Sequence, residues 1–555
     1  MIALQYSLSA SMSVLAHELT ALFDIYDSTS GNNWQWQPEQ LEGPQWNFTR
    51  NEDGDFIDNP CHSFMGQNQS WQGVTCSQSP ATCAMEVCQI TGISLNSYNL
   101  SGQIPPEIGN LTALEVLDIN ANDGLHGRIV PEVGKLVALS HFSLNLNQLT
   151  GTIPSNIGQL TALTYFDVDS NPLSGTIPNT VGNLVSLVQL FIGETAVTGT
   201  IPSTIGQLTA LQVLALYDNL LSGSIPSTLG QLGRLEIWFF YSNRLTGGIP
   251  STIGDMTTLN QVAFYRNQLT GTIPSAIGLL SRIQFLWLYQ NQFTGTIPGA
   301  AMGALTDLVL LDVSNDQLTG TIPSELGHLT TLQMLSLGSN HFTGNIPSTI
   351  SNCSMLQQLW LYDNQLTGQI TSTVGHMPSL RRLDCESNAL TGTLPSAVGN
   401  LTTLETLSLF SNHISGTVPS TFGLLVNLEE CLMSDNIFAG SLPVQMANLK
   451  ALRSLFLQNN LLTGNLDKTF NHSLQLELST VDLSDNLLTG ALASPDLFLL
   501  PQLKVLALSG AYVDVYLRAC LLVCLLACLL FVSDFTPACS LLCTCSELLG
   551  RGTVQ

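Results

Sequence analysis

The chain has 555 residues, of which 45% are hydrophobic and only 10% are charged, against about a quarter charged in an ordinary soluble domain. Fifteen Lys and Arg residues against 40 Asp and Glu residues give a net charge of −25. This balance excludes nucleic acid as a partner, because binding to a phosphate backbone needs a basic surface.

The first 16 residues are expected to be a signal peptide. They are moderately apolar and end in Val14-Leu15-Ala16, which has the form of a cleavage site. No Lys or Arg precedes the apolar stretch, and this departs from the usual pattern.

Residues 17–89 do not follow the periodicity of the rest of the chain and are predicted to form an N-terminal cap. A helix that ends at Ser30-Gly31-Asn32-Asn33 is predicted by apolar residues at helical spacing, namely Leu15, Leu19, Leu22, Phe23 and Tyr26. The cap also holds four of the seven tryptophans and four cysteines: Trp34, Trp36, Trp46, Trp71, Cys61, Cys76, Cys83 and Cys88. Its ten Asp and Glu residues are interpreted as a solvated surface, because Asp53, Asp55 and Asp58 lack the spacing of a calcium loop.

Residues 90–510 repeat with a period of 24, which slips to 25 or 26 at four places, on the template LxxLxLxxNxLtGxIPxxIGxLxx. Seventeen intact copies begin between Ile90 and Leu478, and an eighteenth begins at Leu503 and fails. Apolar residues at positions 1, 4 and 6 of each copy predict a short strand with one buried face. One copy has no core of its own, so neighbouring copies must stack into a continuous column.

Position 9 of the repeat is Asn in fourteen of the seventeen copies. An amide both donates and accepts hydrogen bonds, so stacked copies are predicted to form a ladder that satisfies backbone groups where the chain leaves the strand. Tyr98, Thr195 and Asp316 replace this Asn, and we expect local irregularity at each of them.

Position 13 is Gly in all seventeen copies, from Gly102 to Gly490. This pattern predicts a backbone conformation or a close approach that a Cβ would obstruct. The Pro that follows, as in Ile201-Pro202, belongs at an edge or bend because it has no N–H group to donate.

The LtGxIPxxIGxLxxL half of the template resembles the plant-specific subclass of leucine-rich repeats over residues 90–510. The resemblance implies an α/β solenoid, a right-handed leucine-rich-repeat superhelix with a parallel concave β-sheet, about 17 repeats of 24 residues and a capped N-terminus. Asn59-Pro60-Cys61 and the segment 71–76 resemble the cap of receptor-like kinases, receptor-like proteins and polygalacturonase inhibitors. Such a sheet is an extended binding platform.

With this resemblance, the cap cysteines are interpreted as the disulfides Cys61–Cys76 and Cys83–Cys88, although four cysteines allow three connectivities. Disulfides imply an oxidising compartment, so the protein is expected at the cell surface or plasma membrane, or secreted. Seven Asn-x-Ser/Thr sequons are then candidate glycosylation sites, at Asn47, Asn68, Asn99, Asn110, Asn352, Asn400 and Asn471.

Residues 511–555 form a tail rich in Cys and Leu, with an uncharged run over 519–532. A helix over that run would be about 21 Å long against about 30 Å of hydrocarbon, which is short for a membrane span. Two interpretations stay open, a short or lipidated membrane anchor and an out-of-frame end of the gene. A zinc site is disfavoured because the usual pairs of Cys-x-x-Cys steps are missing.

No catalytic residue, metal site or cofactor site is predicted. The sequence has no phosphate-binding G-x-x-x-x-G-K-[ST] and no set of protein-kinase motifs. Cys385 and Cys431 occupy buried repeat positions and are interpreted as core residues, and Cys353 has no cysteine nearby in sequence. We therefore expect a protein that is not an enzyme and needs no cofactor.

Aromatic residues at strand positions 3, 5 and 7 predict a ligand site on the open face of the sheet. Earlier repeats hold Asp, Asn or Ser at positions 5 and 7, so the template does not require aromatics there. Rings on adjacent strands can also stack simply to stabilise the sheet. The candidate ligand-binding residues are Tyr217, Phe239, Tyr241, Tyr265, Arg266, Phe285, Trp287, Tyr289, Trp360 and Tyr362, with Asp218 and Asp363 beside them.

We therefore expect a receptor-like recognition module without a kinase domain, which binds a peptide, glycan or protein on its concave face. A co-receptor and a membrane reached through the tail are further expected partners. The alternatives are a secreted inhibitor of a cell-wall-degrading enzyme and a structural or adhesive surface protein.

Overall fold

The computed structural model describes residues 14–36, 44–52, 56, 59–61, 70–78, 88–466, 468–489, 497 and 499–508. The chain divides into two compact units, Met1–Leu318 and Thr319–Gln555, and each is described by itself. The predicted signal peptide before Val14 and the tail at 511–555 lie outside the described residues.

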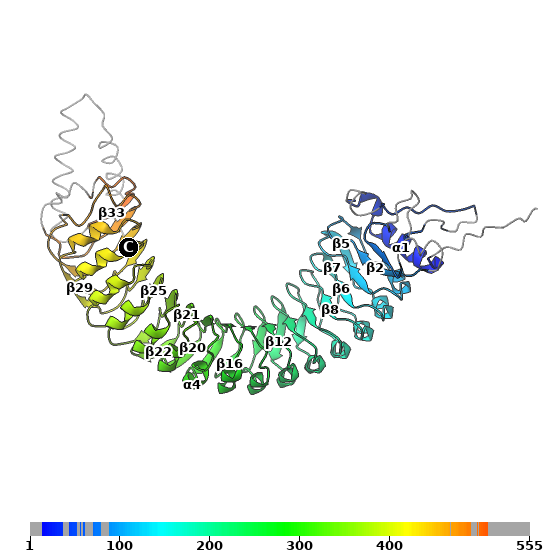
Figure 1. Ribbon diagram of the computed structural model, residues 1–555, viewed down its shortest axis with the longest axis horizontal. Helices are drawn as coiled ribbons and strands as arrows, with labels where there is room; N and C mark the ends of the chain where they lie inside the picture. Colours follow the sequence, from blue (N-terminus) through cyan, green and yellow to red (C-terminus); the bar gives the residue numbers. More distant parts are fainter. Residues whose placement is uncertain are drawn as a thin grey trace, which may run out of the picture. The chain divides into compact units, whose positions relative to one another are not determined.

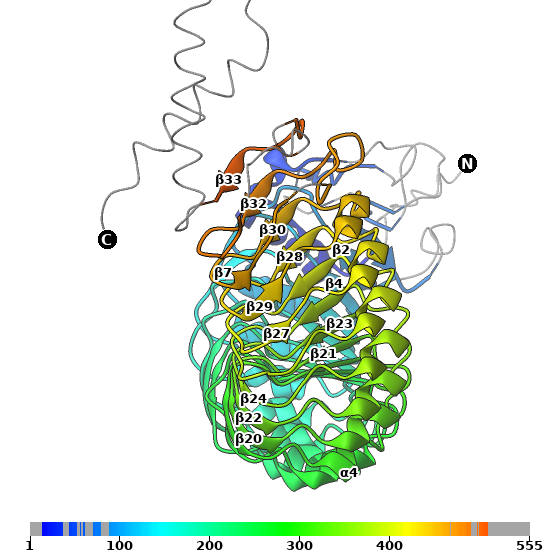
Figure 2. The same cartoon turned by 90° about the vertical axis from the view of Figure 1, so that its left-hand side faces the viewer.

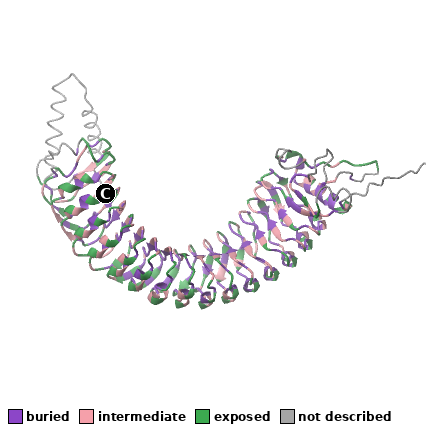
Figure 3. Cartoon of the chain, in the orientation of Figure 1, coloured by how far each residue is buried: buried purple, intermediate pink, exposed green. Residues whose placement is uncertain are grey.

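Most repeats form one coil with a three-residue strand, a turn, a short second strand and a 3-10 helix (Figure 1). The side chains at positions 1, 4 and 6, such as Leu211, Leu214 and Leu216, are fully buried between strand and helix. Figure 3 shows this burial recurring from coil to coil. Because the strand is pleated, the residues between these positions point to the opposite face and form the open surface of the sheet.

In the first unit, α1 (Ala16–Ser28) and η1 (Gly31–Asn33) belong to the cap. The main strands are β1 (Val74–Cys76), β2 (Ile90–Ser94), β4 (Val116–Asp118), β6 (His141–Ser143), β8 (Tyr165–Asp167), β9 (Gln189–Phe191), β11 (Val213–Ala215), β13 (Ile237–Phe239), β15 (Gln261–Ala263), β17 (Phe285–Trp287) and β19 (Leu310–Asp312). The second strands are β3 (Ser101–Gly102), β5 (Gly124–Arg128), β7 (Gln148–Thr150), β10 (Thr198–Thr200), β12 (Leu220–Ser224), β14 (Arg244–Thr246), β16 (Thr270–Gly271) and β18 (Gln292–Gly295). The helices of the repeats are η2 (Pro106–Asn110), η3 (Pro131–Lys135), η4 (Ser155–Gln159), η5 (Asn179–Asn183), η6 (Ser203–Gln207), η7 (Ser227–Gln231), η8 (Ser251–Asp255), η9 (Ser275–Leu279) and α4 (Gly299–Met302).

In the second unit, the main strands are β21 (Met334–Ser336), β23 (Gln358–Trp360), β25 (Arg382–Asp384), β26 (Thr406–Ser408), β28 (Glu430–Leu432), β30 (Ser454–Phe456), β32 (Thr480–Asp482) and β33 (Val505–Ala507). The second strands are β22 (His341–Gly344), β24 (Gln365–Leu366), β27 (Ser415–Gly416), β29 (Ile437–Gly440) and β31 (Leu461–Leu462), and β20 (Gln317–Thr321) spans the point where the units divide. The helices are η10 (Ser324–His328), η11 (Ser348–Asn352), η12 (Ser372–His376), η13 (Ser396–Asn400), η14 (Ser420–Leu424) and η15 (Val444–Asn448). Figure 2 shows β22 and β24 on one side of these coils and the helices on the other.

Main strands of successive repeats pair in parallel and in register. Leu190 pairs with Leu214, and Leu214 with Trp238, so each core position lies beside its equivalent in the next repeat. The cap strand β1 differs, because it pairs with β2 in the antiparallel direction. The expected leucine-rich-repeat solenoid with a capped N-terminus is thus confirmed in its repeating unit.

The asparagine ladder is confirmed, and Asn243 shows how it works. Its Oδ1 accepts the N–H of Leu221 in the preceding coil at 2.9 Å, and its Nδ2 donates to the carbonyls of Leu216 and Phe240 at 2.8 and 3.2 Å. One side chain therefore satisfies backbone groups in two coils. This matters because an unpaired buried polar group costs about 1–3 kcal/mol.

The structure also confirms irregularity where the Asn is replaced. In most repeats the N–H at this position donates to the Asn side chain of the next repeat, as Leu221 does to Asn243. For Leu173 the next repeat has Thr195 instead of Asn, and the Leu173 N–H donates to the Asn171 carbonyl of its own repeat. At Asp316, Oδ1 accepts the N–H of Phe293 at 2.8 Å, but Oδ2 has no hydrogen-bond partner. A carboxylate keeps the acceptor of the amide and loses its donors.

The repeated Gly and Pro act as predicted. Gly199 has a φ of +79°, and a Cβ there would lie 2.8 Å from Thr176 Cγ2 of the preceding coil. Pro202 is extended and stands at the N-cap of η6. Both residues therefore shape the bend that leads from the second strand into the helix.

The cap closes the first coil with a helix, a disulfide and an aromatic cluster. Cys61 and Cys76 form the expected disulfide, with their Cα atoms 5.9 Å apart. Cys88 is disulfide-bonded as well, and Cys83, its expected partner, lies outside the described residues. Trp46 donates through Nε1 to Gln72 O at 2.7 Å, so a buried ring also fixes the loop before β1.

Candidate ligand-binding face

The tyrosine ladder consists of Tyr217, Tyr241, Tyr265 and Tyr289, at position 7 of four consecutive repeats. Neighbouring rings are stacked, with centroids 4.8, 4.5 and 4.5 Å apart and planes within 16° of parallel. All four side chains are half-buried, because each covers the face of the next. The ladder therefore presents ring edges and hydroxyl groups, rather than ring faces, on the open surface of the sheet.

A glycine seats the first ring of the ladder. Position 7 of the preceding repeat is Gly193, and a Cβ there would lie 2.6 Å from Tyr217 Cζ. Asp169, one repeat earlier, accepts hydrogen bonds from the Gly193 N–H and, at 2.9 Å, from the Tyr217 hydroxyl. Gly193 and Asp169 are not among the candidates predicted from the sequence, although a Gly before a run of Tyr at one repeat position could have indicated them.

Position 5 alternates small and aromatic residues beside the ladder. Phe239 pairs with Ala215 and Ala263 on its two sides, and Ala263 pairs with Trp287. Both alanines are buried while Phe239 and Trp287 are half-buried, because the large rings spread over their small neighbours. The ring of Phe285 stacks on Trp287 at 5.4 Å. Phe239 also lies 6.1 Å from Tyr241 of the ladder, measured between ring centroids.

Position 8, three residues after the main strand of each repeat, has a left-handed backbone conformation, which the sequence did not reveal. Asp218 has a φ of +47°, Arg266 of +54° and Asp363 of +51°. This turn carries the side chains out to solvent, and all three are exposed. Arg266 donates through Nε to Gln290 Oε1 at 3.0 Å, beside the far end of the ladder.

The second unit has a similar but smaller aromatic group, in which a tyrosine ring again packs against a glycine. Tyr362 is seated on Gly338, where a Cβ would lie 2.5 Å from the ring. Arg382 lies 5.7 Å from the centre of the Trp360 ring and forms an ion pair with Asp384 at 3.2 Å. In this unit, therefore, the guanidinium group of Arg382 lies over the Trp360 ring.

One carboxyl group and two phenol groups at the start of the tyrosine ladder have raised pKa values. Burial, with a smaller contribution from the neighbouring Asp167, raises the pKa of Asp169 to about 7. Burial and the nearby Asp169 raise the pKa of Tyr217 well above its usual range, and burial likewise raises the pKa of Tyr241. These phenols therefore stay protonated at physiological pH and can both donate and accept hydrogen bonds.

The six sequons in the described parts of the chain lie outside the main strands. Asn110, Asn352 and Asn400 are each the last residue of a 3-10 helix, in η2, η11 and η13. Asn47 and Asn99 are exposed, Asn471 is half-buried, and Asn68 is outside the described residues. Glycans on the helical side would leave the open face of the sheet uncovered.

The three free cysteines among the described residues are all buried core residues. Burial raises the pKa of Cys353 to about 11 and that of Cys431 to about 12, and it raises the pKa of Cys385 as well. Cys353 Sγ lies 3.4 Å from Leu326 O. Thiols in this state are poor nucleophiles, which fits their expected role in packing.

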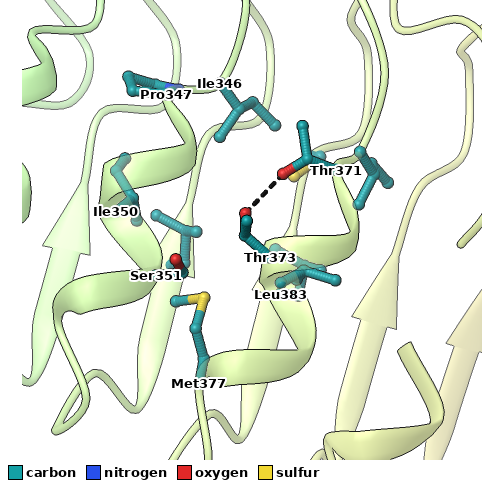
Figure 4. Close-up of a pocket in the computed structure, with 12 residues that line it drawn as sticks. Ile346, Pro347, Ile350, Ser351, Thr371, Thr373, Met377 and Leu383 are labelled. Carbon is teal, nitrogen blue, oxygen red and sulfur yellow. Dashed lines mark hydrogen bonds between the residues drawn. The ribbon is translucent and has the colours of Figure 1, made fainter. Parts of the chain in front are cut away.

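A small apolar cavity lies between η11 and η12 of the second unit (Figure 4). Ser351 stands where most repeats have Gly, and at Gly327 a Cβ would come within 2.3 Å of the next coil. Thr371 stands where most repeats have Pro, and its hydroxyl lies 2.7 Å from that of Thr373. The space of about 30 Å³ would hold about one water molecule, so we interpret it as a packing gap.

The described parts of the chain lack two further features. No cluster of three or more His, Cys, Asp or Glu side chains could hold a metal ion there. No helix in those parts has the length and apolar character to cross a membrane.

Family models match both units of the chain. A model described as Leucine-rich repeat region matches residues 93–237. A second, described as Leucine Rich Repeat, matches residues 331–353, 379–401 and 403–425. The predicted repeats are confirmed in each of these segments.

Solved structures of plant receptors share the fold. The plant peptide hormone receptor RGFR1 in complex with RGF2 is 34% identical, with a TM-score of 0.74, over 79% of this chain and 72% of that chain. The Arabidopsis receptor kinase HAESA in complex with the peptide hormone IDA and the co-receptor SERK1 is 26% identical, with a TM-score of 0.52. This match covers 89% of this chain and 90% of that chain.

A curated relative matches over a shorter stretch. A probable LRR receptor-like serine/threonine-protein kinase of Arabidopsis thaliana is 42% identical over 65 residues. These make up 10% of this chain and 6% of that protein, so the chain spans a small part of the length of this relative.

Proposed function

The chain belongs to the leucine-rich-repeat family of the plant-receptor type, and from that premise we propose that it is a recognition module that binds a peptide or protein ligand on the open face of its sheet. The site is the tyrosine ladder with the neighbouring Phe239, Phe285 and Trp287. Arg266 and Asp218 form its polar edge. Trp360 and Tyr362, with Asp363, form a second contact surface in the other unit.

The tyrosine ladder carries this proposal. The same repeat position holds Asn120 and Asn145 in coils of the same fold, so the solenoid does not need aromatic rings there. A half-exposed aromatic row with protonated hydroxyls is a surface of the kind that supplies hot spots in protein interfaces. The related complexes of RGFR1 and HAESA with peptide hormones support a peptide as the ligand.

We propose an extracellular setting and a role in signalling together with a partner chain. The cap disulfide suits an oxidising compartment, and the sequons on the helical side suit a glycosylated surface. The co-receptor in the HAESA complex supports a co-receptor as partner here. Attachment to a membrane through residues 511–555, and the absence of enzymatic activity, belong to the same proposal.

A secreted inhibitor of a cell-wall-degrading enzyme is the second candidate function. It would use the same open face for a protein partner. The seated stack of rings favours a narrow, extended ligand, because its exposed surface is one row of hydroxyls rather than a broad patch.

The test is to replace Tyr241, Tyr265 and Trp287 together by Ser and to select a displayed library of random peptides on both proteins. Peptides that bind the native chain and lose about tenfold or more in affinity for the variant support the site. The control is a variant with Thr258, Thr306 and Ser324, which lie outside the main strands, changed to Ala. A library without any ladder-dependent peptide, or a variant that melts early yet binds unchanged, would refute the proposal.

A further inference from the structure

The two ends of the tyrosine ladder carry opposite charges. Glu194, in the repeat before Tyr217, and Asp218, in the same repeat as Tyr217, are both exposed at position 8. Both raise the pKa of Tyr241, after the larger effects of burial and of Tyr265. Arg266 stands at the other end, where it lowers the pKa of Tyr289 against the effect of burial. A ligand lying along the ladder would therefore meet carboxylates first and a guanidinium last.

The open face of the first unit has an excess of negative charge. Over residues 90–316, strand positions 3, 5, 7 and 8 hold one Arg and six carboxyl groups: Asp118, Asp167, Asp169, Glu194, Asp218 and Asp312. The ion pairs of the described second unit lie within residues 381–453, and neither Glu194 nor Asp218 takes part in them. Glu194 accepts a hydrogen bond from the Ser170 hydroxyl at 2.6 Å, which leaves its charge uncompensated.

The rings offer oxygen atoms to a cation. Stacking covers the faces of Tyr241 and Tyr265, so a sugar or other flat group finds no free aromatic face between them. The hydroxyl oxygens of both rings can accept hydrogen bonds, and Asp218 lies near enough to add to the raised pKa of both tyrosines, after the larger effect of burial. Guanidinium and ammonium groups donate hydrogen bonds to such oxygens and pair with carboxylates, and the pairing with charge makes these bonds strong.

The length of the ladder sets the size of the ligand segment. Its three ring-to-ring steps of 4.8, 4.5 and 4.5 Å match the length of about four residues of extended chain. An extended peptide crossing the strands would thus reach from Glu194 and Asp218 to Arg266 within one short segment.

We propose that the tyrosine ladder binds an extended peptide with an arginine or lysine side chain held between Glu194 and Asp218, and with the chain running towards Arg266. This inference rests on the proposed function and names the chemistry of its ligand. The phenol oxygens of Tyr217 and Tyr241 accept hydrogen bonds from the cationic group.

The test uses the ladder-dependent peptides selected above and the double variant Glu194→Gln/Asp218→Asn. Both residues are exposed, so the variant is expected to fold. Selected peptides should be enriched in Arg or Lys, and changing that Arg to uncharged citrulline should lower affinity about tenfold for the native chain and hardly at all for the variant.

The matched control is Asp255→Asn/Asp307→Asn. It also removes two negative charges, but at exposed positions outside the main strands, and it should leave affinity unchanged. Ladder-dependent peptides that are neutral or acidic, or that bind the Glu194→Gln/Asp218→Asn variant as well as the native chain, would overturn this inference and leave the proposed function standing. Ladder-dependent glycans without such peptides would also overturn it. A library with no ladder-dependent binder would overturn both.

Discussion

At the scale of single residues, the asparagine ladder shows how one changed atom alters stability. Asn291 donates from Nδ2 to the carbonyls of Phe264 and Leu288 at 3.0 and 2.8 Å. Asp316 stands at the equivalent position of the next repeat, and its Oδ2 replaces that donor. A carboxylate at such a site is disfavoured, so burial raises the pKa of Asp316 to about 8.

Asp316→Asn is expected to stabilise the protein. Below about pH 4 the Asp is protonated in both states, but between about pH 4 and pH 8 the unfolded chain loses the proton that the folded chain keeps, so folding stability falls as pH rises. The Asn variant should lack this fall and gain about 1–3 kcal/mol near pH 8. Thermal melts at pH 4, 6 and 8 measure the difference.

The control for that experiment is Asp307→Asn, at an exposed position of the same repeat, three residues before β19. It should leave the melting temperature unchanged at every pH. If Asp316→Asn lowers stability, or stabilises equally at pH 4 and pH 8, Asp316 does not titrate as its burial and its missing partner imply.

At the scale of secondary-structure elements, most 3-10 helices of the repeats follow an Ile-Pro step. Thr371 replaces this Pro before η12, yet its φ of −78° and ψ of 157° are those a Pro would adopt. The preceding Ile370 is the residue found before Pro in most repeats. The chain therefore holds a Pro-compatible backbone without a Pro.

Thr371→Pro is expected to stabilise the second unit by about 0.4–1 kcal/mol, because it restricts the unfolded chain while fitting the folded one. Loss of the hydrogen bond between the hydroxyls of Thr371 and Thr373 offsets part of this gain. Denaturant unfolding compared with Thr371→Ala, which loses the same hydroxyl, separates the two effects. A Pro variant no more stable than the Ala variant would contradict the prediction.

At the scale of the whole molecule, stability is expected to be local, because each coil contacts mainly its neighbours. The cap protects the first coils of its unit through the Cys61–Cys76 disulfide and the pairing of β1 with β2. Glu18 of α1 adds a buried contact, a 3.3 Å hydrogen bond from the Ile90 N–H.

Reduction of the cap disulfides should therefore increase hydrogen exchange first in β2 and β4 and much less in β15 and β17. A disulfide closing a loop of this length contributes about 3 kcal/mol. Mass spectrometry of exchanged peptides, with and without reductant, measures the gradient. Exchange that rose equally in all four strands would show that the array unfolds as one cooperative unit.

The structure of a single coil could be predicted from the sequence because the same residue pattern recurs in every repeat. The apolar positions 1, 4 and 6, the asparagine ladder and the Gly at position 13 each follow from short-range chemistry, and repetition makes the pattern unmistakable. The aromatic residues could be named as candidates for the same reason, since Tyr217 to Tyr289 depart from a known template.

Only the tertiary structure decided how these residues meet. Stacking of the rings, the seat on Gly193 and the anchor at Asp169 join residues one or two repeats apart, and their contacts depend on the register of neighbouring coils. The left-handed turn at position 8 is equally hidden, because residues as different as Glu194 and Arg266 adopt it. The sequence by itself thus determined the repeating coil, through local patterns of burial and hydrogen bonding. The surface that the coils present arises from side chains brought together by stacking, and therefore only the folded chain specifies it.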